Sequence, residues 1–148
     1  MFFKIERLPL EELRAFLRKQ ADDAFPDLKD EGRLNILAKK WAANAECCTC
    51  RNDDNELIGM IAFYANNPQS GFAYIPHVYV SSDYRKMGVF SRMLGKVDEY
   101  VRGMGFSAIK LEVGNNNRGA YLAYLRNGFV LKEIASPHSI HMTKMLKK

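Results

Sequence analysis

Hydrophobic residues recur along this chain with two different periods, and each change of period marks the boundary of a predicted element. Helical spacing predicts three long helices, and Pro9 fits the first turn of the first one. Their apolar faces are Leu10, Leu13, Leu17 and Ala21; Leu34, Leu37, Ala38 and Trp41; and Phe90, Met93, Leu94, Val97, Val101 and Met104. Pro26 ends the first helix, and Gly103 and Gly105 suit the C-terminal cap of the third. A shorter helix is predicted over 118–126, and Gly128 can close it.

Runs with period two, rich in β-branched and aromatic residues, predict strands between these helices. They cover residues 2–8, 46–52, 56–66, 71–82, 107–113, 129–135 and 139–146. Proline cannot donate to a sheet ladder, so Pro76 predicts irregular or one-sided pairing within the fourth strand. The resulting order, β-α-α-β-β-β-α-β-α-β-β, predicts an α/β fold of the mixed α+β kind, with helices packed on one sheet. A chain of 148 residues suits a single domain over 1–148.

Composition and charge narrow the class of protein further. The start "MFFKIERL" is too short and too charged for a signal peptide, and the longest apolar stretch, Leu57–Ala65, is well below the roughly 20 residues of a membrane span. We therefore expect a cytoplasmic protein that has no membrane partner. The net charge of +5 fits an anionic ligand or simple solubility. Its cations are spread along the chain, so no nucleic-acid surface is expected.

The three cysteines lie together in "CCTC", as Cys47, Cys48 and Cys50. An odd, clustered set does not suit a disulfide framework, and no fourth ligand with zinc-site spacing lies nearby. We expect reduced thiols within a strand and no metal site.

The candidate chemistry begins at "YRKMGVF", residues 84–90, which is predicted to lie between a strand and a helix. A helix N-terminus offers unpartnered N–H groups and a partial positive charge, so it can bind a phosphate. Gly88 would allow the close approach of a phosphate, and Arg85 and Lys86 would add charge. By itself, however, this stretch fits an ordinary solvated turn better than a phosphate site. Neither the P-loop motif nor the glycine motif of dinucleotide-binding folds is present.

A second segment, "LEVGNNNRGAYLAYLRNGF", changes this assessment. Together the two segments resemble the GCN5-related N-acetyltransferase (GNAT) superfamily. In that family a strand leads into Arg/Gln-x-x-Gly-x-Gly/Ala, whose backbone amides bind the pyrophosphate of coenzyme A. The matching residues here are Arg85, Lys86, Met87, Gly88, Val89 and Phe90. Phe90 stands where the family has glycine or alanine, which bears on how closely the last amide can approach a phosphate.

The family's downstream pattern is Asn-x-x-Ala-x-x-x-Tyr-x-x-x-Gly-Phe. This chain matches each fixed position, from Asn117 through Ala120 and Tyr124 to Phe129. The resemblance implies transfer of an acetyl group from acetyl-CoA to an amine. It also implies that Tyr124 protonates the departing thiolate and that Asn117 contacts the pantetheine arm. The amides of Val78, Tyr79 and Val80 would then bind the oxyanion.

The base that deprotonates the amine has two candidates. Glu112 lies on the polar face of its strand, twelve residues before Tyr124, in a placement that resembles enzymes of the superfamily. His77 has a suitable pKa of about 6.5 and lies on the strand beside the expected acetyl group. Each has a structural alternative: a surface salt bridge for Glu112, and a hydrogen-bonded structural histidine for His77.

The resemblance implies that the acceptor is a small-molecule or peptide amine, and a homodimer is common in the family. Tyr64, Asn66 and Asn67 could contact the acceptor or could simply form a hairpin loop. Two other functions stay open. One is a coenzyme A-binding regulator without turnover, and the other is a basic module that binds nucleic acid.

Overall fold

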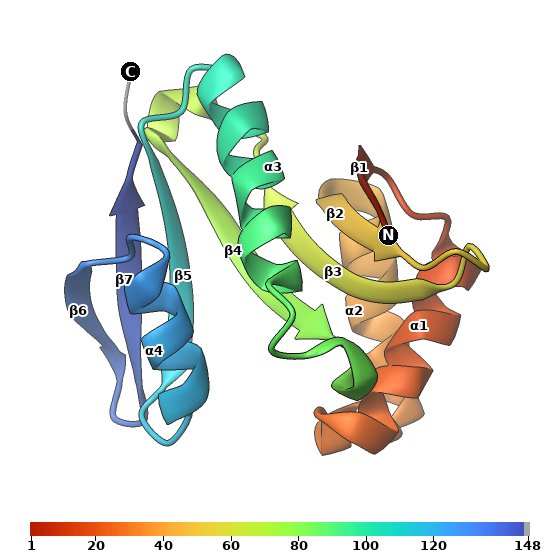
Figure 1. Cartoon of the computed structure of the whole chain (residues 1–148). Helices are drawn as coiled ribbons and strands as arrows, with labels where there is room; N and C mark the ends of the chain where they lie inside the picture. The colour runs from red at the N-terminus through yellow and green to blue at the C-terminus, as the bar shows by residue number, and fades with distance from the viewer. Residues whose placement is uncertain (147–148) are drawn as a thin grey trace. The chain divides into compact units, whose positions relative to one another are not determined.

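The computed structural model describes residues 1–146, except the side chain of Leu131. Its helices and strands follow the predicted order (Figure 1), which confirms the fold class. The elements are β1 (Phe2–Glu6), α1 (Leu10–Asp23), η1 (Pro26–Lys29), α2 (Glu31–Asn44), β2 (Glu46–Arg51), β3 (Leu57–Tyr64), η2 (Pro68–Ser70), β4 (Phe72–Val80), η3 (Ser82–Tyr84), α3 (Val89–Gly103), β5 (Ala108–Gly114), α4 (Arg118–Arg126), β6 (Leu131–Ser136) and β7 (Ser139–Met145).

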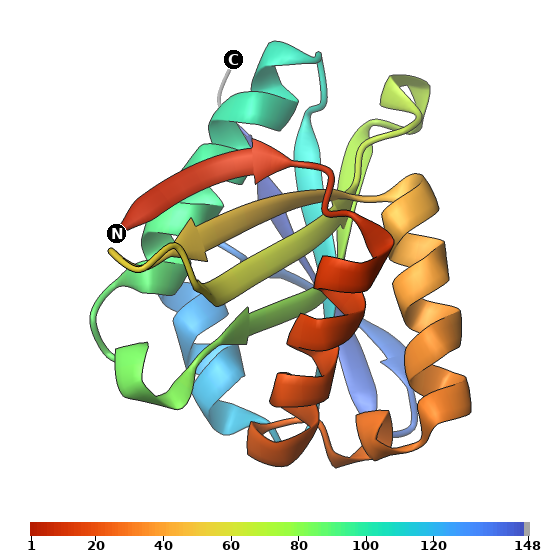
Figure 2. The ribbon, with the colours of Figure 1, turned by 90° about the vertical axis from the view of Figure 1, so that its right-hand side faces the viewer.

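The strands form one sheet in the order β1-β2-β3-β4-β5-β7-β6. Figure 2 shows β1, β2 and β3 side by side. The β1–β2, β2–β3, β5–β7 and β6–β7 pairs are antiparallel, whereas β4 and β5 run parallel. The sheet is therefore mixed, as the alternation of helices and strands predicts.

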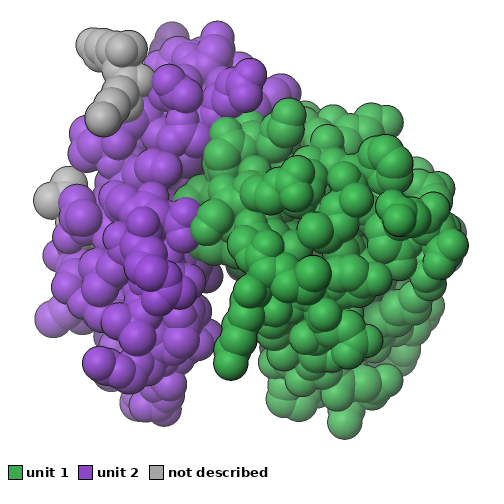
Figure 3. All heavy atoms as spheres, in the orientation of Figure 1, with its two compact units in different colours: residues 1–63, 77–97 green, residues 64–76, 98–148 purple. Residues whose placement is uncertain are grey.

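The chain divides into two compact units (Figure 3). Unit 1 comprises residues 1–63 and 77–97, and unit 2 comprises residues 64–76 and 98–148. Each unit is discontinuous, since β4 and α3 contribute residues to both. The single domain over 1–148 stays a prediction.

In unit 1, α1 and α2 lie on the same side of β1, β2 and β3 (Figure 2). The buried side chains on this side include Leu13, Leu17, Leu34, Trp41 and Met60. Asp30 caps α2, because its side chain accepts a hydrogen bond from the Arg33 N–H at 3.2 Å. Residues 89–97 of α3 pack on the strands as well. The Met93 Cε lies 3.2 Å from the point that a Cβ on Gly59 would occupy, so this glycine lets the helix approach β3 closely.

In unit 2, the register of β5 and β7 separates two faces of the sheet. Leu111 pairs with Met142, and both side chains are buried. Val113, which is also buried, pairs with Ile140. On the other face, Glu112 pairs with His141. The registered pairs of β4 with β5 run from Phe72 to Ile75, and Pro76 follows. This is where the proline was predicted to interrupt the pairing.

The predicted strand cysteines lie in β2 and are buried, free thiols. Burial raises the pKa of both Cys47 and Cys48 to about 12, and it raises that of Cys50 as well. At pH 8 a thiol with such a pKa is ionised only about once in ten thousand molecules, and the thiolate is the reactive form.

We therefore expect the native protein to resist thiol reagents. An aromatic disulfide reagent at pH 8 should titrate almost no thiol in the folded chain and all three cysteines in denaturant. The denatured titration is the control for reagent and protein concentration. Rapid reaction of one thiol in the native protein would show that β2 opens or that its burial is incomplete.

Candidate functional site

The loop between β4 and α3 in unit 1 has a backbone shaped to hold an anion. Lys86 and Gly88 have positive φ angles, 63° and 78°, on either side of Met87. Turns of this kind gather N–H groups on one side, and α3 begins directly afterwards with its own unpartnered N–H groups. The Gly88 carbonyl accepts the hydrogen bond from Arg92 N at 3.1 Å. A Cβ on Gly88 would meet nothing within 4 Å, so an approaching phosphate would find open space there.

The side chains of this loop and of the first turn of α3 differ in their exposure and their contacts. Lys86 and Met87 are exposed, Val89 is buried and Phe90 is half-buried. The Arg85 Nε donates to the Val80 carbonyl at 2.9 Å, and its Nη2 donates to Asp23 Oδ2 at 2.7 Å. Arg85 therefore forms an ion pair with Asp23, and its contribution of charge to a phosphate stays a prediction.

The end of β4 is fixed by contacts within unit 1. The Tyr79 hydroxyl donates to Asp23 Oδ2 at 2.5 Å, and Ser81 N donates to the Ile58 carbonyl at 2.8 Å. Burial, followed by the hydrogen bond to Asp23, raises the pKa of Tyr79 to about 12. The use of the Val78, Tyr79 and Val80 amides as an oxyanion hole stays a prediction.

His77 lies in an aromatic enclosure in unit 1. Its Nε2 is 2.6 Å from Gln20 Oε1, and its ring centroid is 4.5 Å from that of Phe25 and 4.8 Å from that of Trp41. The side chain is buried, and burial lowers its pKa to about 4. The imidazole is therefore neutral at physiological pH and a weak proton acceptor. These contacts match the structural alternative considered for this histidine.

Glu112, in unit 2, lies among polar side chains contributed by β7. Ser139 Oγ donates to Glu112 Oε2 at 2.6 Å, and His141 Nε2 lies 3.6 Å from Glu112 Oε1. The edge of the His141 ring faces Tyr74, with 6.3 Å between centroids. Burial and then the charge of Glu112 raise the pKa of Tyr74. With 45% of its side chain exposed, Glu112 is accessible to water.

His141 had no role in the sequence prediction. The period of two in "SIHMTKML" places Ser139 and His141 on one face of β7, and the register sets His141 opposite Glu112. The alternation was visible in the sequence, but the partner strand was not.

The predicted pantetheine contact and the predicted acid both belong to the α4 region. Asn117 is the N-cap of α4, since its Oδ1 accepts from Ala120 N at 3.2 Å. This contact explains the spacing of two motif residues by local helix geometry. Tyr124 packs against Phe129 with ring centroids 5.8 Å apart, and burial raises its pKa to about 12. Its hydroxyl therefore carries a proton at neutral pH.

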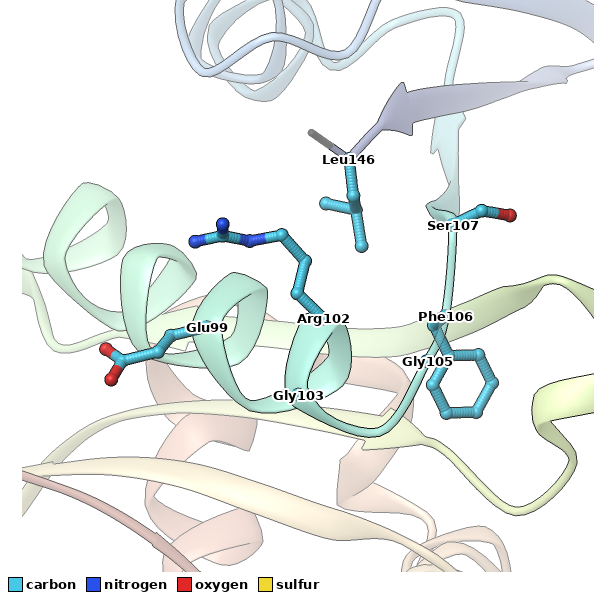
Figure 4. A pocket seen from close by; sticks show the side chains of 7 residues that line it. All are labelled: Glu99, Arg102, Gly103, Gly105, Phe106, Ser107 and Leu146. Carbon is cyan, nitrogen blue, oxygen red and sulfur yellow. The ribbon is translucent and has the colours of Figure 1, made fainter. Parts of the chain in front are cut away.

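Unit 2 also contains two surface hollows that the sequence did not predict. One, of about 480 Å³, lies at the C-terminal end of α3 (Figure 4) and is lined by Glu99, Arg102, Gly103, Gly105, Phe106, Ser107 and Leu146. The other, of about 280 Å³, lies beside α4 and is lined by Val113, Gly114, Asn115, Arg118, Tyr121 and Ile140. Neither lining includes a residue predicted to act in catalysis or cofactor binding.

Residues 1–146 lack two features that would point to other kinds of function. No group of three or more His, Cys, Asp or Glu side chains in this part of the chain is placed to hold a metal ion. Within the same residues, no helix combines the length and apolar character required to span a membrane.

Comparison with known proteins identifies the family to which this chain belongs. The family model described as the acetyltransferase (GNAT) family matches residues 10–129, which is more than half of the chain. The chain therefore belongs to the GNAT family, and the resemblance seen in its two motifs is confirmed.

Curated relatives match part of the chain. An uncharacterized N-acetyltransferase of Methanocaldococcus jannaschii is 31% identical over 81 residues, covering 52% of this chain and 36% of the relative. Streptothricin acetyltransferase A of Bacillus subtilis is 32% identical over 78 residues, covering 53% of this chain and 44% of the relative. The matched segments thus span less than half the length of these relatives.

Solved structures match almost the whole chain and establish the fold. A putative acyl-CoA N-acyltransferase of Klebsiella pneumoniae gives a TM-score of 0.76 at 21% identity, covering 99% of this chain and 97% of that one. An N-acetyltransferase of Thermoplasma acidophilum, solved in complex with coenzyme A, gives 0.74 at 16% identity, covering 98% and 99%.

The environment of His77 generates a prediction for stability. The pKa of His77 in the folded chain, about 4, lies below its ordinary value of about 6.5. The contribution of this group to the unfolding free energy is therefore fully present above about pH 6.5 and decreases as the pH falls towards 4. The loss attributable to this group is about 3 kcal/mol of unfolding free energy.

Urea unfolding of the wild type and of His77→Gln between pH 7.5 and 4.5 measures this loss. The variant removes the titrating group but keeps an amide that can hydrogen-bond to Gln20, so its unfolding free energy should fall less steeply with acid. The carboxylates titrate in both proteins and cancel in the comparison. Parallel pH dependences would contradict the buried, neutral state of His77.

Proposed function

We propose that this protein is an N-acetyltransferase that moves the acetyl group of acetyl-CoA to a primary amine by direct attack in a ternary complex. The observation that carries the proposal is the loop of residues 85–88, whose left-handed residues lead into α3 in a chain of the GNAT family. The Thermoplasma relative solved with coenzyme A supports it. A putative streptothricin acetyltransferase of Bacillus anthracis, solved in complex with acetyl coenzyme A, supports it as well.

Cofactor binding is assigned mainly to the backbone of this loop. In the proposal, the N–H groups from Lys86 to Phe90 hold the pyrophosphate, Gly88 provides the space, and the exposed Lys86 adds positive charge. The half-buried Phe90 takes the position that is glycine or alanine elsewhere in the family. Asn117 and Ala120 shape the start of α4, and Asn117 contacts the pantetheine arm.

Tyr124 is the proposed general acid. A thiolate that leaves the tetrahedral intermediate gains from a proton, and the raised pKa of Tyr124 keeps one on its hydroxyl. The amides of Val78, Tyr79 and Val80 are the proposed donors to the oxyanion of that intermediate.

We favour Glu112 over His77 as the base. An alkyl ammonium has a pKa of about 10.4, so a water-accessible group must accept its proton before the amine can attack. Glu112 is accessible and held by Ser139, which leaves Oε1 facing His141. His77 is buried against Gln20 and two aromatic rings, with a pKa of about 4.

The acceptor class is a small-molecule or peptide amine. The match to a streptothricin acetyltransferase supports a small-molecule amine, although it covers only 53% of this chain. Action in the cytoplasm and assembly as a homodimer belong to the same proposal.

The first test of the proposal concerns Gly88. We expect acetyl-CoA to raise the melting temperature of the wild type, since a ligand at about 100 times its dissociation constant adds roughly 2.7 kcal/mol of stability. Gly88→Glu should abolish the shift, because its carboxylate would fill the open space at the loop and repel the phosphates.

The matched control is Gly95→Glu, which places the same side chain at an exposed site on α3 where a Cβ also meets nothing. It should retain the shift. Binding that survives Gly88→Glu would place the pyrophosphate elsewhere, and binding without turnover on a panel of amines would favour a regulator.

The second test concerns Tyr124. Tyr124→Phe should lower kcat by about 100-fold, the low end of a general acid's contribution, while the acetyl-CoA dissociation constant stays unchanged. Tyr121→Phe, on the same helix, is the control, since the Tyr121 hydroxyl contacts Lys132 of β6. Release of free thiol measures turnover. Equal kcat values for the wild type and Tyr124→Phe would remove Tyr124 as the acid.

A further inference from the structure

The C-terminal end of α1 carries negative charge, where the helix dipole disfavours it. Asp22 and Asp23 end this helix, and no basic residue lies in its last turn. Anionic side chains are stabilising at a helix N-terminus and unfavourable at the C-terminus. Asp22 and Asp23 are both exposed residues, and the Asp23 side chain keeps 23% of its surface exposed. The position of Asp23 therefore calls for an explanation beyond the stability of α1.

The contacts of Asp23 lead directly to the proposed phosphate-binding loop. Its Oδ2 accepts hydrogen bonds from the Tyr79 hydroxyl at 2.5 Å and from Arg85 Nη2 at 2.7 Å. The same guanidinium donates from Nε to the Val80 carbonyl at 2.9 Å and lies 5.9 Å from the centre of the Tyr79 ring. One carboxylate thus joins the end of α1, the end of β4 and the first residue of the loop.

The loop needs such an anchor because its next residue is strained. Lys86 has a φ of 63°, a conformation that costs free energy for any residue other than glycine and persists when the surroundings impose it. Arg85 immediately precedes Lys86, and two directed hydrogen bonds and an aromatic face hold its side chain. Fixing Arg85 fixes the start of the Lys86–Gly88 turn.

We propose that Asp23 is a positioning residue for the phosphate-binding loop, and that Arg85 acts as its strut rather than as a ligand of the phosphate. This inference rests on the proposed function, because coenzyme A is the anion that the loop would hold. Asp23 touches neither reacting atoms nor, in this proposal, the cofactor.

The positioning role and simple electrostatics predict opposite effects on coenzyme A binding when the charge of Asp23 is removed. Removing a negative charge near an anion site should strengthen anion binding when the charge acts only through space. Losing the anchor should weaken binding, because the loop must then be ordered by the ligand. Asp22→Asn removes the same charge from the same helix end without touching the strut, so it is the matched control.

Titration calorimetry with coenzyme A, well below the melting temperature of each variant, separates these cases. Asp23→Asn should weaken binding by about tenfold, because a neutral amide oxygen replaces the carboxylate and the charge-assisted hydrogen bond to Arg85 becomes weaker. Asp22→Asn should bind as the wild type does or slightly more tightly. Asp23→Asn binding as tightly as Asp22→Asn would overturn the inference. A purely structural role would lower the melting temperature and leave this affinity unchanged, which also overturns it.

Arg85→Lys provides a second test that does not depend on Asp23→Asn folding. It keeps the positive charge but cannot make both directed contacts, so a strut predicts about tenfold weaker coenzyme A binding. Unchanged affinity would show that Arg85 contributes only charge. The double variant Asp23→Asn/Arg85→Lys should bind coenzyme A about as tightly as whichever single variant has the lower affinity. Both changes disrupt the same contact between Asp23 and Arg85, so their effects should not add. Additive losses would contradict the coupling.

These outcomes stay distinct from failure of the proposed function. A wild type that binds no coenzyme A would overturn both the acetyltransferase proposal and the inference. A wild type that binds it, together with an Asp23→Asn variant that binds equally well, would overturn the inference alone.

Discussion

The candidate cofactor site depends on one backbone constraint, the turn through which the chain leaves β4 and starts α3. Two left-handed residues, Lys86 and Gly88, lie within this turn and expose the first N–H groups of the helix. Glycine adopts such a conformation easily, but lysine does not. The surrounding side chains must therefore maintain the turn, and Arg85 with its two hydrogen bonds is placed to do so.

Burial divides the titratable groups of the chain into two kinds. Desolvation shifts the pKa values of His77, Tyr79, Tyr124 and the cysteines of β2 in the direction that favours their neutral forms. Glu112 is different, because water reaches it and polar groups of β7 surround it. The environment of each group, and not its residue type alone, therefore decides which protonation state the fold favours.

Local patterns in the sequence predicted the elements well, and α4 shows why. Its predicted span, 118–126, matches the structure because a side-chain cap at Asn117 starts the helix and Gly128 follows its end. Pro76 likewise predicted an interruption of strand pairing, and the registered pairs of β4 with β5 end at Ile75. The contacts of Asp23 with Arg85, 62 residues away, and of His141 with Glu112 were not predictable. A period identifies the face on which a residue lies, but not which other element covers that face.

The discontinuous units have a consequence for how the chain matures on the ribosome. Unit 1 includes residues 77–97, which carry the end of β4 and the first part of α3, so its full set of contacts exists only after these residues have been synthesised. By then residues 64–76 have already emerged, and the strand that they begin pairs with β5, which has not yet been synthesised. Neither unit is thus encoded by one continuous stretch of chain, and the edge of β4 that pairs with β5 has no partner strand there until β5 emerges.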